Sequence, residues 1–378
     1  MKTDKTLFTP GPLTTSLSVK QAMLRDLGSR DIEFMSAVRE IRAELLSLAG
    51  ASEKTHSAII MQGSGTFSLE AVVSSVVPPG KAILIAINGA YGRRMARIAE
   101  IHGARAVAIE FPESSPVDPE KVFDALQADA DIAIATCCHC ETTSGIINPV
   151  REIGHAVSAS NREFCVDAMS SFGAVPLSVV DCGVDYLVSS SNKCIEGVPG
   201  FGFVIANLEA LRKKASMART LCLDLLDQHE ALERTGQFRF TPPTHALLAF
   251  RQALIELKAE GGVEGRAARY KNNYETLVEG MWELGFTEFL KPDDQGYIIT
   301  SFYCPKDPRF SFDAFYLYLS ERGFVIYPGK VGTADCFRIG SIGRIDKSDV
   351  KALLATIADY IQKTGIEMNG ETDARREA

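Results

Sequence analysis

Residues 82–89 read Ala82-Ile83-Leu84-Ile85-Ala86-Ile87-Asn88-Gly89, an apolar run that ends at a turn. Six consecutive apolar residues are typical of a strand that is buried on both faces. Similar runs alternate with segments of helix length through residue 207, which predicts an α/β fold with a mainly parallel sheet covered on both faces. Strands are predicted at Ala58–Met61, Ala82–Ile87, Ala106–Phe111, Asp131–Thr136, Phe164–Met169, Tyr186–Ser190 and Gly202–Ala206, and helices at Thr66–Val76, Tyr91–His102, Pro119–Leu126 and Pro149–Ser160.

The pattern changes after Asn207, where two long helical stretches precede shorter segments. These segments are Thr244–Glu260, Gly265–Leu284, Tyr297–Cys304, Phe312–Arg322, Phe324–Pro328, Phe337–Gly340 and Lys347–Lys363. They predict a smaller α+β domain at the C-terminal side. We therefore expect an N-terminal arm over residues 1–15, a large domain over 16–245, a connecting helix over 246–270 and a small domain over 271–378. The charged residues Gly370–Ala378 are expected to fray.

The composition excludes several classes of partner. The chain has 378 residues with 48 Asp and Glu against 40 Lys and Arg, so its net charge is -8. Nucleic acids and anionic membranes are poor partners for such a chain, because binding to them draws on clustered Lys and Arg. No apolar run approaches the ~20 residues needed to span a bilayer. The polar start Met1–Lys5 lacks the apolar core of a secretory signal.

The nine cysteines are an odd number, and three of them, Cys137, Cys138 and Cys140, crowd one predicted strand end where they could not all pair. This usage favours a reducing compartment, and we expect a cytoplasmic protein. The run Cys-Cys-His-Cys at 137–140 lacks a second pair of ligands elsewhere, as most zinc sites require, so no metal is expected.

Three short segments that follow predicted strands carry chemistry. The first is Gln62-Gly63-Ser64-Gly65-Thr66, where a strand leads into a helix. Glycines allow close approach of an anion, hydroxyls donate hydrogen bonds, and the helix N-terminus adds unpaired N–H groups and partial positive charge. The segment is a candidate phosphate cup, although strand-to-helix turns also use Gly and Ser for ordinary capping.

The second segment places Asp167 at the C-terminal end of a predicted parallel strand, where such sheets bind ligands. Its alternative role is to cap the next segment. The third places Lys193 after Ser189-Ser190-Ser191-Asn192 and before the glycine-rich turn Gly197–Gly202. Burial in a cleft would lower the pKa of this amine and make it nucleophilic, whereas the alternative is a solvated loop lysine. An anion cup, a carboxylate and a lysine in this order match what pyridoxal 5'-phosphate requires.

Together with further motifs, these three segments make the chain resemble the class V, fold type I pyridoxal-phosphate aminotransferases over almost its whole length. Within that family it is most similar to the 2-aminoethylphosphonate:pyruvate transaminases. The resemblance implies a large domain with a mostly parallel seven-stranded sheet and a smaller α+β C-terminal domain. The matching motifs are Leu7–Thr15, Gln62–Thr66, Asn88–Gly92, His139–Gly145, Val166–Gly173, Asn192–Phe203, Phe240–His245, Gly323–Lys330 and Phe337–Gly340.

The resemblance also implies a role for individual residues. Lys193 would form the Schiff base with the cofactor and shuttle the proton, and Asp167 would pair with the pyridinium nitrogen. Ser64, Gly65 and Thr66 would bind the phosphate, Thr142 would touch the phenolic oxygen, Tyr91 would stack on the ring, and Arg338 would bind the substrate's anionic group. Thr241 and Thr244 match positions that reach the phosphate held by the other subunit, which implies a homodimer. For Tyr91 and the two threonines the alternative is packing and turn capping.

The substrate that the resemblance implies is 2-aminoethylphosphonate, with pyruvate as acceptor and phosphonoacetaldehyde and alanine as products. The stretch Leu27–Phe34 departs from the Cys-Thr-Trp-Asp sequence that many such transaminases carry. Within it, Arg30 is a candidate second cation for the phosphonate or a surface partner of Asp31 or Glu33. The alternatives are an alanine:glyoxylate or serine:pyruvate aminotransferase and a cysteine desulfurase-like lyase. Cys304 and Cys336 fit the lyase poorly because they stand in predicted strands rather than on a loop.

Overall fold

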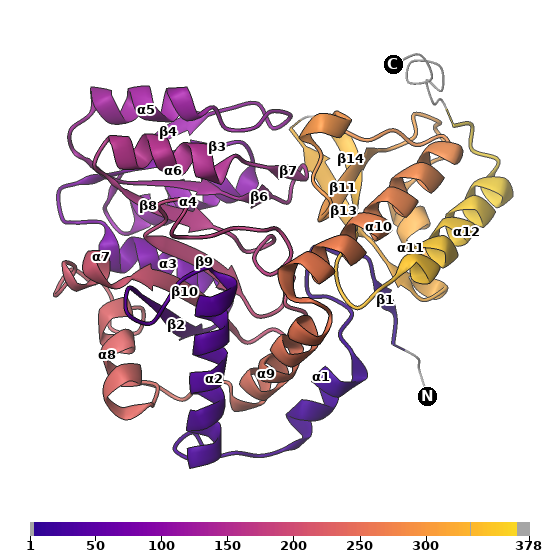
Figure 1. The fold of residues 1–378 in the computed structure, drawn as a ribbon. Helices are drawn as coiled ribbons and strands as arrows, with labels where there is room; N and C mark the ends of the chain where they lie inside the picture. Colours follow the sequence, from indigo (N-terminus) through magenta and orange to yellow (C-terminus); the bar gives the residue numbers. More distant parts are fainter. Residues whose placement is uncertain (1–3, 333, 369–378) are drawn as a thin grey trace.

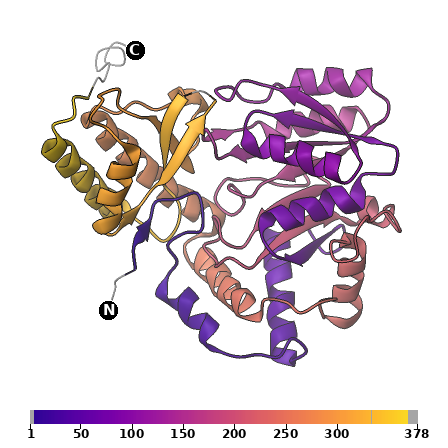
Figure 2. The ribbon, with the colours of Figure 1, turned by 180° about the vertical axis from the view of Figure 1, so that it is seen from behind.

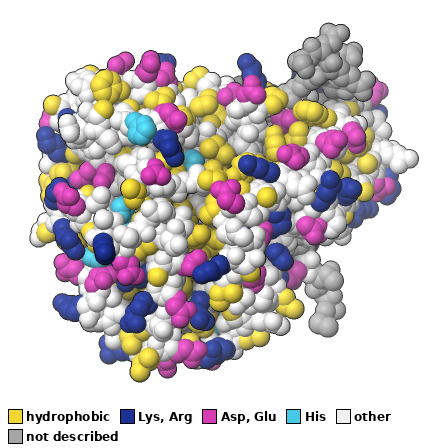
Figure 3. Space-filling model, in the orientation of Figure 1, with side chains coloured by type: hydrophobic (Ala, Val, Ile, Leu, Met, Phe, Trp, Pro, Cys, Tyr) yellow, Lys and Arg dark blue, Asp and Glu magenta, His cyan; other side chains and the backbone are white. Residues whose placement is uncertain are grey.

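The computed structural model describes residues 4–332 and 334–368, which form two lobes of unequal size (Figure 1, and in space-filling form Figure 3). The large lobe is built around a seven-stranded sheet and the small lobe around a three-stranded one. Gly370–Ala378, which we expected to fray, lie outside the described residues. Within the described ranges, no helix has both the length and the apolar character needed to cross a membrane.

The large sheet confirms the predicted α/β architecture. Its order is β2-β10-β9-β8-β5-β3-β4, and the only antiparallel neighbours are those of β10. Two predicted strands have the observed bounds, Ala82–Ile87 and Tyr186–Ser190, and the others differ by one or two residues at their ends. The strands are β2 (His56–Gln62), β3 (Ala82–Ile87), β4 (Arg105–Glu110), β5 (Ile132–Cys138), β8 (Glu163–Asp167), β9 (Tyr186–Ser190) and β10 (Phe201–Asn207).

Helices cover both faces of this sheet, which explains why its central strands are apolar throughout. Along β3, the side chains of Ala82, Leu84 and Ala86 enter one hydrophobic cluster, and those of Ile83, Ile85 and Ile87 enter the other. The first cluster lies under α2 (Ile32–Leu48), α5 (Pro119–Ala128), α6 (Val150–Ala159) and α9 (Thr244–Ala259). The second lies under α3 (Gly65–Val76), α4 (Ala90–Ile101) and α7 (Leu208–Arg212), while α8 (Leu225–Thr235) runs beside β2.

The small lobe packs three helices around an antiparallel sheet with the order β11-β14-β13. Its core is rich in aromatic rings, among them Phe302, Phe315 and Phe337. The residues expected to form one connecting helix, 246–270, belong to two helices that meet near Gly261, whose φ is +102°. The domain boundaries themselves stay a prediction. The elements are α10 (Gly262–Glu283), β11 (Ile299–Tyr303), α11 (Phe312–Glu321), β12 (Phe324–Val325), β13 (Tyr327–Val331), β14 (Ala334–Gly340) and α12 (Lys347–Thr364).

The first described residues run along the small lobe before the chain enters the large one (Figure 2). Strand β1 (Thr6–Leu7) pairs in parallel with β12, far away in the sequence. We call residues 4–15 the N-terminal arm. It is followed by α1 (Leu17–Gln21) and a 3-10 turn, η1 (Ala22–Leu24), both of which pack on α9. Three more short elements complete the fold: β6 (Cys140–Glu141), β7 (Ile146–Ile147) and η2 (Pro292–Asp294).

Candidate active site

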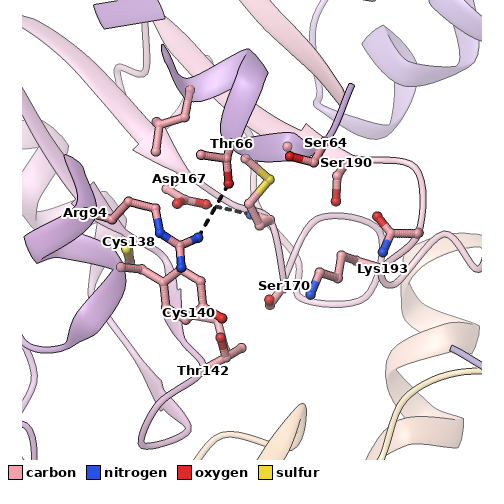
Figure 4. A pocket seen from close by; sticks show the side chains of 15 residues that line it. Ser64, Thr66, Arg94, Cys138, Cys140, Thr142, Asp167, Ser170, Ser190 and Lys193 are labelled. Atoms are coloured by element: carbon pink, nitrogen blue, oxygen red, sulfur yellow. Dashed lines mark hydrogen bonds between the residues drawn. The ribbon is translucent and has the colours of Figure 1, made fainter. Parts of the chain in front are cut away.

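A cavity of about 210 Å³ opens where the parallel strands of the large sheet end (Figure 4). The C-terminal edge of such a sheet is the usual place for a ligand. The lining residues lie at or just after the ends of β2, β3, β5, β8 and β9, so segments from five strands contribute to one site. They are Ser64, Gly65, Thr66, Leu69, Tyr91, Arg94, Cys138, Cys140, Thr142, Asp167, Met169, Ser170, Ser190, Asn192 and Lys193. The structure thus brings together the predicted phosphate cup, the carboxylate and the lysine.

The predicted phosphate cup is the start of α3. Ser64 occupies the N-cap position with extended backbone angles, but its hydroxyl makes no capping hydrogen bond. It therefore remains available to a ligand, together with the unpaired N–H groups of the first helical turn. At Gly65 a Cβ atom would lie 2.2 Å from the Met169 sulfur, so a larger residue there would have to displace the Met169 side chain.

A cation that the sequence analysis missed stands beside this cup. The guanidinium of Arg94 lies 3.4 Å from the Thr66 hydroxyl and 4.8 Å from the centre of the Tyr91 ring. Arg94 follows Tyr91 by three residues on α4, so helical spacing places both side chains on one face. That spacing was the signal in the sequence from which Arg94 could have been inferred.

Asp167 is a buried carboxylate with too few partners. It is 5% exposed, and the donor that it has among the described residues is the Met169 backbone N–H, 3.0 Å from Oδ1. Burial raises its pKa to about 6. A buried carboxylate is costly unless it meets a cation or several hydrogen-bond donors. Asp167 lines the cavity, so a ligand that carries a protonated ring nitrogen would supply what the protein does not.

Lys193 enters the same cavity from the turn after β9. Its ammonium group donates to the backbone oxygen of Pro10, at 2.5 Å, in the N-terminal arm. Burial lowers the pKa of this amine to about 8, and the positive charge of Arg338 acts in the same direction. A lysine with such a pKa is partly neutral near physiological pH and can act as a nucleophile or a base.

Thr142 and Tyr91 line the cavity, and both adjoin a further buried acid, Glu141; their roles toward the cofactor stay a prediction. The Glu141 carboxylate accepts from the Tyr91 backbone N–H at 3.3 Å and from the Thr143 hydroxyl at 2.7 Å. It therefore holds the start of α4, where a negative charge is favourable. Burial raises the pKa of Glu141.

Arg338 lies beside the cavity rather than among its lining residues. Its guanidinium donates to the backbone oxygen of Thr142 at 2.9 Å and to that of Pro328 at 2.9 Å and 3.2 Å. It also lines a second, more open cavity in the small lobe. These acceptors are neutral carbonyl oxygens, so they do not cancel the positive charge of Arg338, which can still attract an anion.

Besides Arg338, three predicted residues lie outside the cavity lining of the single chain. Arg30 is exposed in the turn before α2, Thr241 is exposed, and Thr244 begins α9 and is half-buried. The Gln62 side chain donates to the backbone oxygens of Phe240 and Thr241, at 2.9 Å and 3.3 Å. The turn that carries the two threonines is therefore attached to the phosphate cup of its own chain.

The cysteines near the site are protonated and unpaired. Burial raises the pKa of Cys138 and of Cys140, which line the cavity, and none of the nine cysteines forms a disulfide. Within residues 4–332 and 334–368 no cluster of His, Cys, Asp and Glu could hold a metal ion.

Comparison with known proteins gives the family. The profile of the aminotransferase class-V family matches residues 15–333. The chain is 49% identical to the 2-aminoethylphosphonate–pyruvate transaminase of Phocaeicola vulgatus over 93% of its length and 97% of that protein, and 47% identical to the one of Syntrophobacter fumaroxidans over 95% and 97%.

Among solved structures, the pyridoxamine-pyruvate aminotransferase of Mesorhizobium loti superposes with a TM-score of 0.88 at 25% identity, covering 97% of this chain and 94% of that one. The fold type I architecture inferred from the motifs is thereby confirmed. The extent of these matches and the residues gathered in the cavity establish that the chain belongs to the class V aminotransferases.

Proposed function

We propose that this protein is a pyridoxal-phosphate-dependent transaminase that moves the amino group of 2-aminoethylphosphonate to pyruvate, giving phosphonoacetaldehyde and L-alanine. The observation that carries the proposal is the grouping of the Ser64–Thr66 cup, Asp167 and Lys193 in one cavity. Relatives that are 43–49% identical over most of the chain and bear this activity in their names support the choice of substrates.

The residues present fit the cofactor. The N-terminus of α3 and the hydroxyls of Ser64 and Thr66 suit a phosphate, and Arg94 adds positive charge beside them. The under-paired carboxylate of Asp167 suits a protonated ring nitrogen. When bound, pyridoxal phosphate supplies a conjugated ring that accepts the electrons released as a substrate C–H bond is broken.

Lys193 provides the base. With cofactor and substrate bound, its neutral Nζ would take the proton from the substrate carbon that bears the amino group and would return a proton on the other side of the cavity. Asp167 keeps the ring nitrogen protonated, and Thr142 and Tyr91 line the cavity around the ring. Both half-reactions use the same lysine, because each moves one proton between the same two positions.

Arg338 is the proposed anchor for the anionic group of each substrate. Its forked guanidinium can hold two oxygens of a phosphonate or a carboxylate, and the Thr142 carbonyl fixes it next to the cavity. Arg30 stays a second candidate cation for the doubly charged phosphonate, although it is exposed in the single chain.

We further propose that the active unit is a homodimer, with Thr241 and Thr244 reaching the phosphate in the other subunit. This can be tested by mixing inactive Lys193→Ala chains with chains inactivated by Thr241→Ala and Thr244→Ala. A mixed dimer would contain one site with an intact lysine and intact threonines, so activity should return. If subunits exchange and no activity returns, the cross-subunit role is wrong. The unpaired thiols support a reducing compartment, which we propose is the cytoplasm.

A donor screen tests the substrate assignment. The purified holoenzyme is mixed with one donor at a time, and the conversion of its absorbance spectrum to that of the pyridoxamine form is followed. The donors are 2-aminoethylphosphonate, taurine as the matched skeleton with a singly charged sulfonate, β-alanine, L-serine and L-alanine. Rapid conversion by 2-aminoethylphosphonate and its reversal by pyruvate are expected, with taurine slow. Conversion by L-serine but not by the phosphonate would favour a serine:pyruvate transaminase.

A further inference from the structure

The amine of Lys193 is held by the N-terminal arm. Its Nζ donates to the backbone oxygen of Pro10 at 2.5 Å. The next residue, Gly11, packs along the lysine side chain: a Cβ at this position would lie 2.7 Å from Cδ and 2.9 Å from Nζ of Lys193, and the φ of Gly11 is +119°. Two independent features of the arm, a carbonyl and a missing side chain, thus face the same lysine.

The small lobe determines where that carbonyl lies. Beside the pairing of β1 with β12, the Phe8 backbone N–H donates to the Val325 oxygen at 2.8 Å, and the Gly340 N–H donates to the Phe8 oxygen at 3.0 Å. The Phe8 ring is fully buried in the core of the small lobe. The Thr9 hydroxyl closes the turn by donating to the Pro12 oxygen at 2.6 Å. The lysine therefore comes from one lobe and its acceptor from the other.

We propose that the Pro10 carbonyl is a positioning group that orients the Lys193 amine whenever the lysine is not joined to the cofactor. The inference rests on the proposed transaminase function, in which that amine must act as a base. A free lysine side chain has many rotamers, and one hydrogen bond to a fixed carbonyl removes most of them. Because the acceptor is neutral, it orients the amine without holding it in the protonated form as strongly as a carboxylate would.

A backbone substitution tests this without changing any side chain at the contact. A synthetic segment 1–15 with glycolate in place of Gly11 is ligated to residues 16–378 carrying Ser16→Cys. The Pro10 carbonyl then belongs to an ester and is a weaker acceptor. The matched control is the same ligated chain with an all-amide backbone, which shares the Ser16→Cys change.

The first measurement is the pH dependence of Lys193 acetylation in the cofactor-free chains, followed by peptide mapping. A weaker acceptor favours the neutral amine, so the midpoint should fall by about 0.5 pH unit in the ester chain. The second is kinetics of the holoenzyme, where kcat should fall about tenfold and the KM for the amino donor should stay unchanged. An unchanged midpoint, or a shifted midpoint with unchanged kcat, would overturn the positioning role. The midpoint of Lys193 acetylation is measured without substrate. A shift of this midpoint would therefore still show that the Pro10 carbonyl acts on the lysine, even if 2-aminoethylphosphonate proved to be the wrong donor.

A simpler variant gives a second test. Gly11→Ala adds a Cβ against Lys193, whereas Gly80→Ala is a matched control with a φ of +76° and open space around its Cβ. Recombination of the cofactor-free protein with pyridoxal phosphate should slow at least tenfold for Gly11→Ala and not for Gly80→Ala. Equal rates for Gly11→Ala and the unmodified chain would contradict the contact.

Discussion

The turn after β9 carries a buried charge, Glu196, and a half-buried one, Lys193, which differ in how many partners they have. Glu196 is 3% exposed and saturated with partners: Arg269 and the Tyr270 hydroxyl donate to it at 2.7 Å and 2.6 Å, and Arg266 lies at 3.4 Å. Lys193, three residues earlier, has one acceptor among the described residues, the neutral backbone oxygen of Pro10. The same loop therefore contributes to two sets of charges. Glu196 with Arg266, Arg269 and Tyr270 forms what we call the saturated cluster, whereas Lys193 belongs to the under-paired charges of the cavity.

The pKa values follow the same division. In the saturated cluster, the neighbouring carboxylates raise the pKa of Arg269 above its ordinary value despite burial, and so favour its charged form. In the cavity, burial raises the pKa of Asp167 to about 6 and lowers that of Lys193 to about 8, so both groups are pushed toward neutrality. A saturated cluster holds the fold together, whereas under-paired charges in a cavity mark the place of a ligand.

The strongest test of the under-paired charges in the cavity removes the Lys193 amine. Lys193→Ala should lower transamination by about 10⁴-fold or more, because both the covalent attachment and the proton transfer are lost. Borohydride reduction of the holoenzyme followed by peptide mapping should place the cofactor on Lys193 alone. A label on another lysine would show that the assignment is wrong.

The complementary test breaks the saturated cluster. Arg266 is 1% exposed and also donates to Glu260 at 2.7 Å and to the Cys194 oxygen at 2.6 Å. Arg266→Ala should cost about 3–5 kcal/mol of unfolding free energy, because the buried Glu196 and the half-buried Glu260 both lose a partner. Denaturant unfolding of the cofactor-free chain measures it, with Arg25→Ala, in the exposed pair with Glu33, as a control that should change little. Equal effects of the two variants would refute the distinction.

Arg338 lies between the two cases, since the hydrogen-bond partners that it has among the described residues are all neutral. Arg338→Ala should lose about 2–5 kcal/mol of transition-state stabilisation in both half-reactions, and Arg338→Lys should raise the KM for both substrates, because an ammonium lacks the fork. Cofactor absorbance should stay normal in both variants. Stopped-flow measurement of each half-reaction tests this role. If the 2-aminoethylphosphonate half-reaction of Arg338→Ala had a near-normal rate, Arg30 would become the leading candidate for the anchor of the anionic group.

Asp167→Asn should separate stability from activity. The pKa of Asp167 is raised in the folded state, so its ionised form destabilises the fold above pH 6, and this cost is absent below the unfolded value of about 4. The variant should therefore gain about 1–2 kcal/mol of stability at pH 8 without cofactor while losing activity. Thermal unfolding at pH 8 and near pH 4 measures it. A gain of equal size at both pH values would point to a cause other than the carboxylate charge.

The smallest effect concerns pH and the lysine alone. Because the pKa of Lys193 is lowered to about 8, the neutral amine accumulates as the pH rises through that value. Recombination of the cofactor-free protein with pyridoxal phosphate should accelerate between pH 7 and 9 and then level off. Stopped-flow absorbance measures this rate. A rate that continues to rise toward pH 10.5 would indicate an ordinary, solvated lysine.

The elements that the sequence predicted well are those buried on both faces. Ala82–Ile87 is apolar at every position, so no choice of face or register was needed to recognise it. The helix α2 (Ile32–Leu48) was not predicted, although its apolar residues recur at helical spacing, Phe34, Val38, Ile41 and Leu45. The pairing of β1 with β12 involves two residues in each strand, too few to leave a pattern.

The residues of the site also divide into those that could be predicted from the sequence and those that could not. Ser64, Asp167 and Lys193 could be predicted because their residue types carry the chemistry and they follow recognisable strands. The Pro10 carbonyl that accepts from Lys193 could not be predicted, because every residue has a backbone carbonyl. Only the folded N-terminal arm brings this carbonyl to the lysine. Arg94 needed the geometry of α4 to bring it beside Thr66.

The pairing of the arm with the small lobe also sets an order of assembly. A ribosome makes residues 4–15 long before the strands that receive them, β12 and β14. The large sheet, complete at Asn207, can form while synthesis continues, since domains generally fold as units from the N-terminal side. The cavity would then have its cup, its carboxylate and its lysine before the Pro10 carbonyl can dock, so a segment synthesised before the large sheet would be the last to join the site.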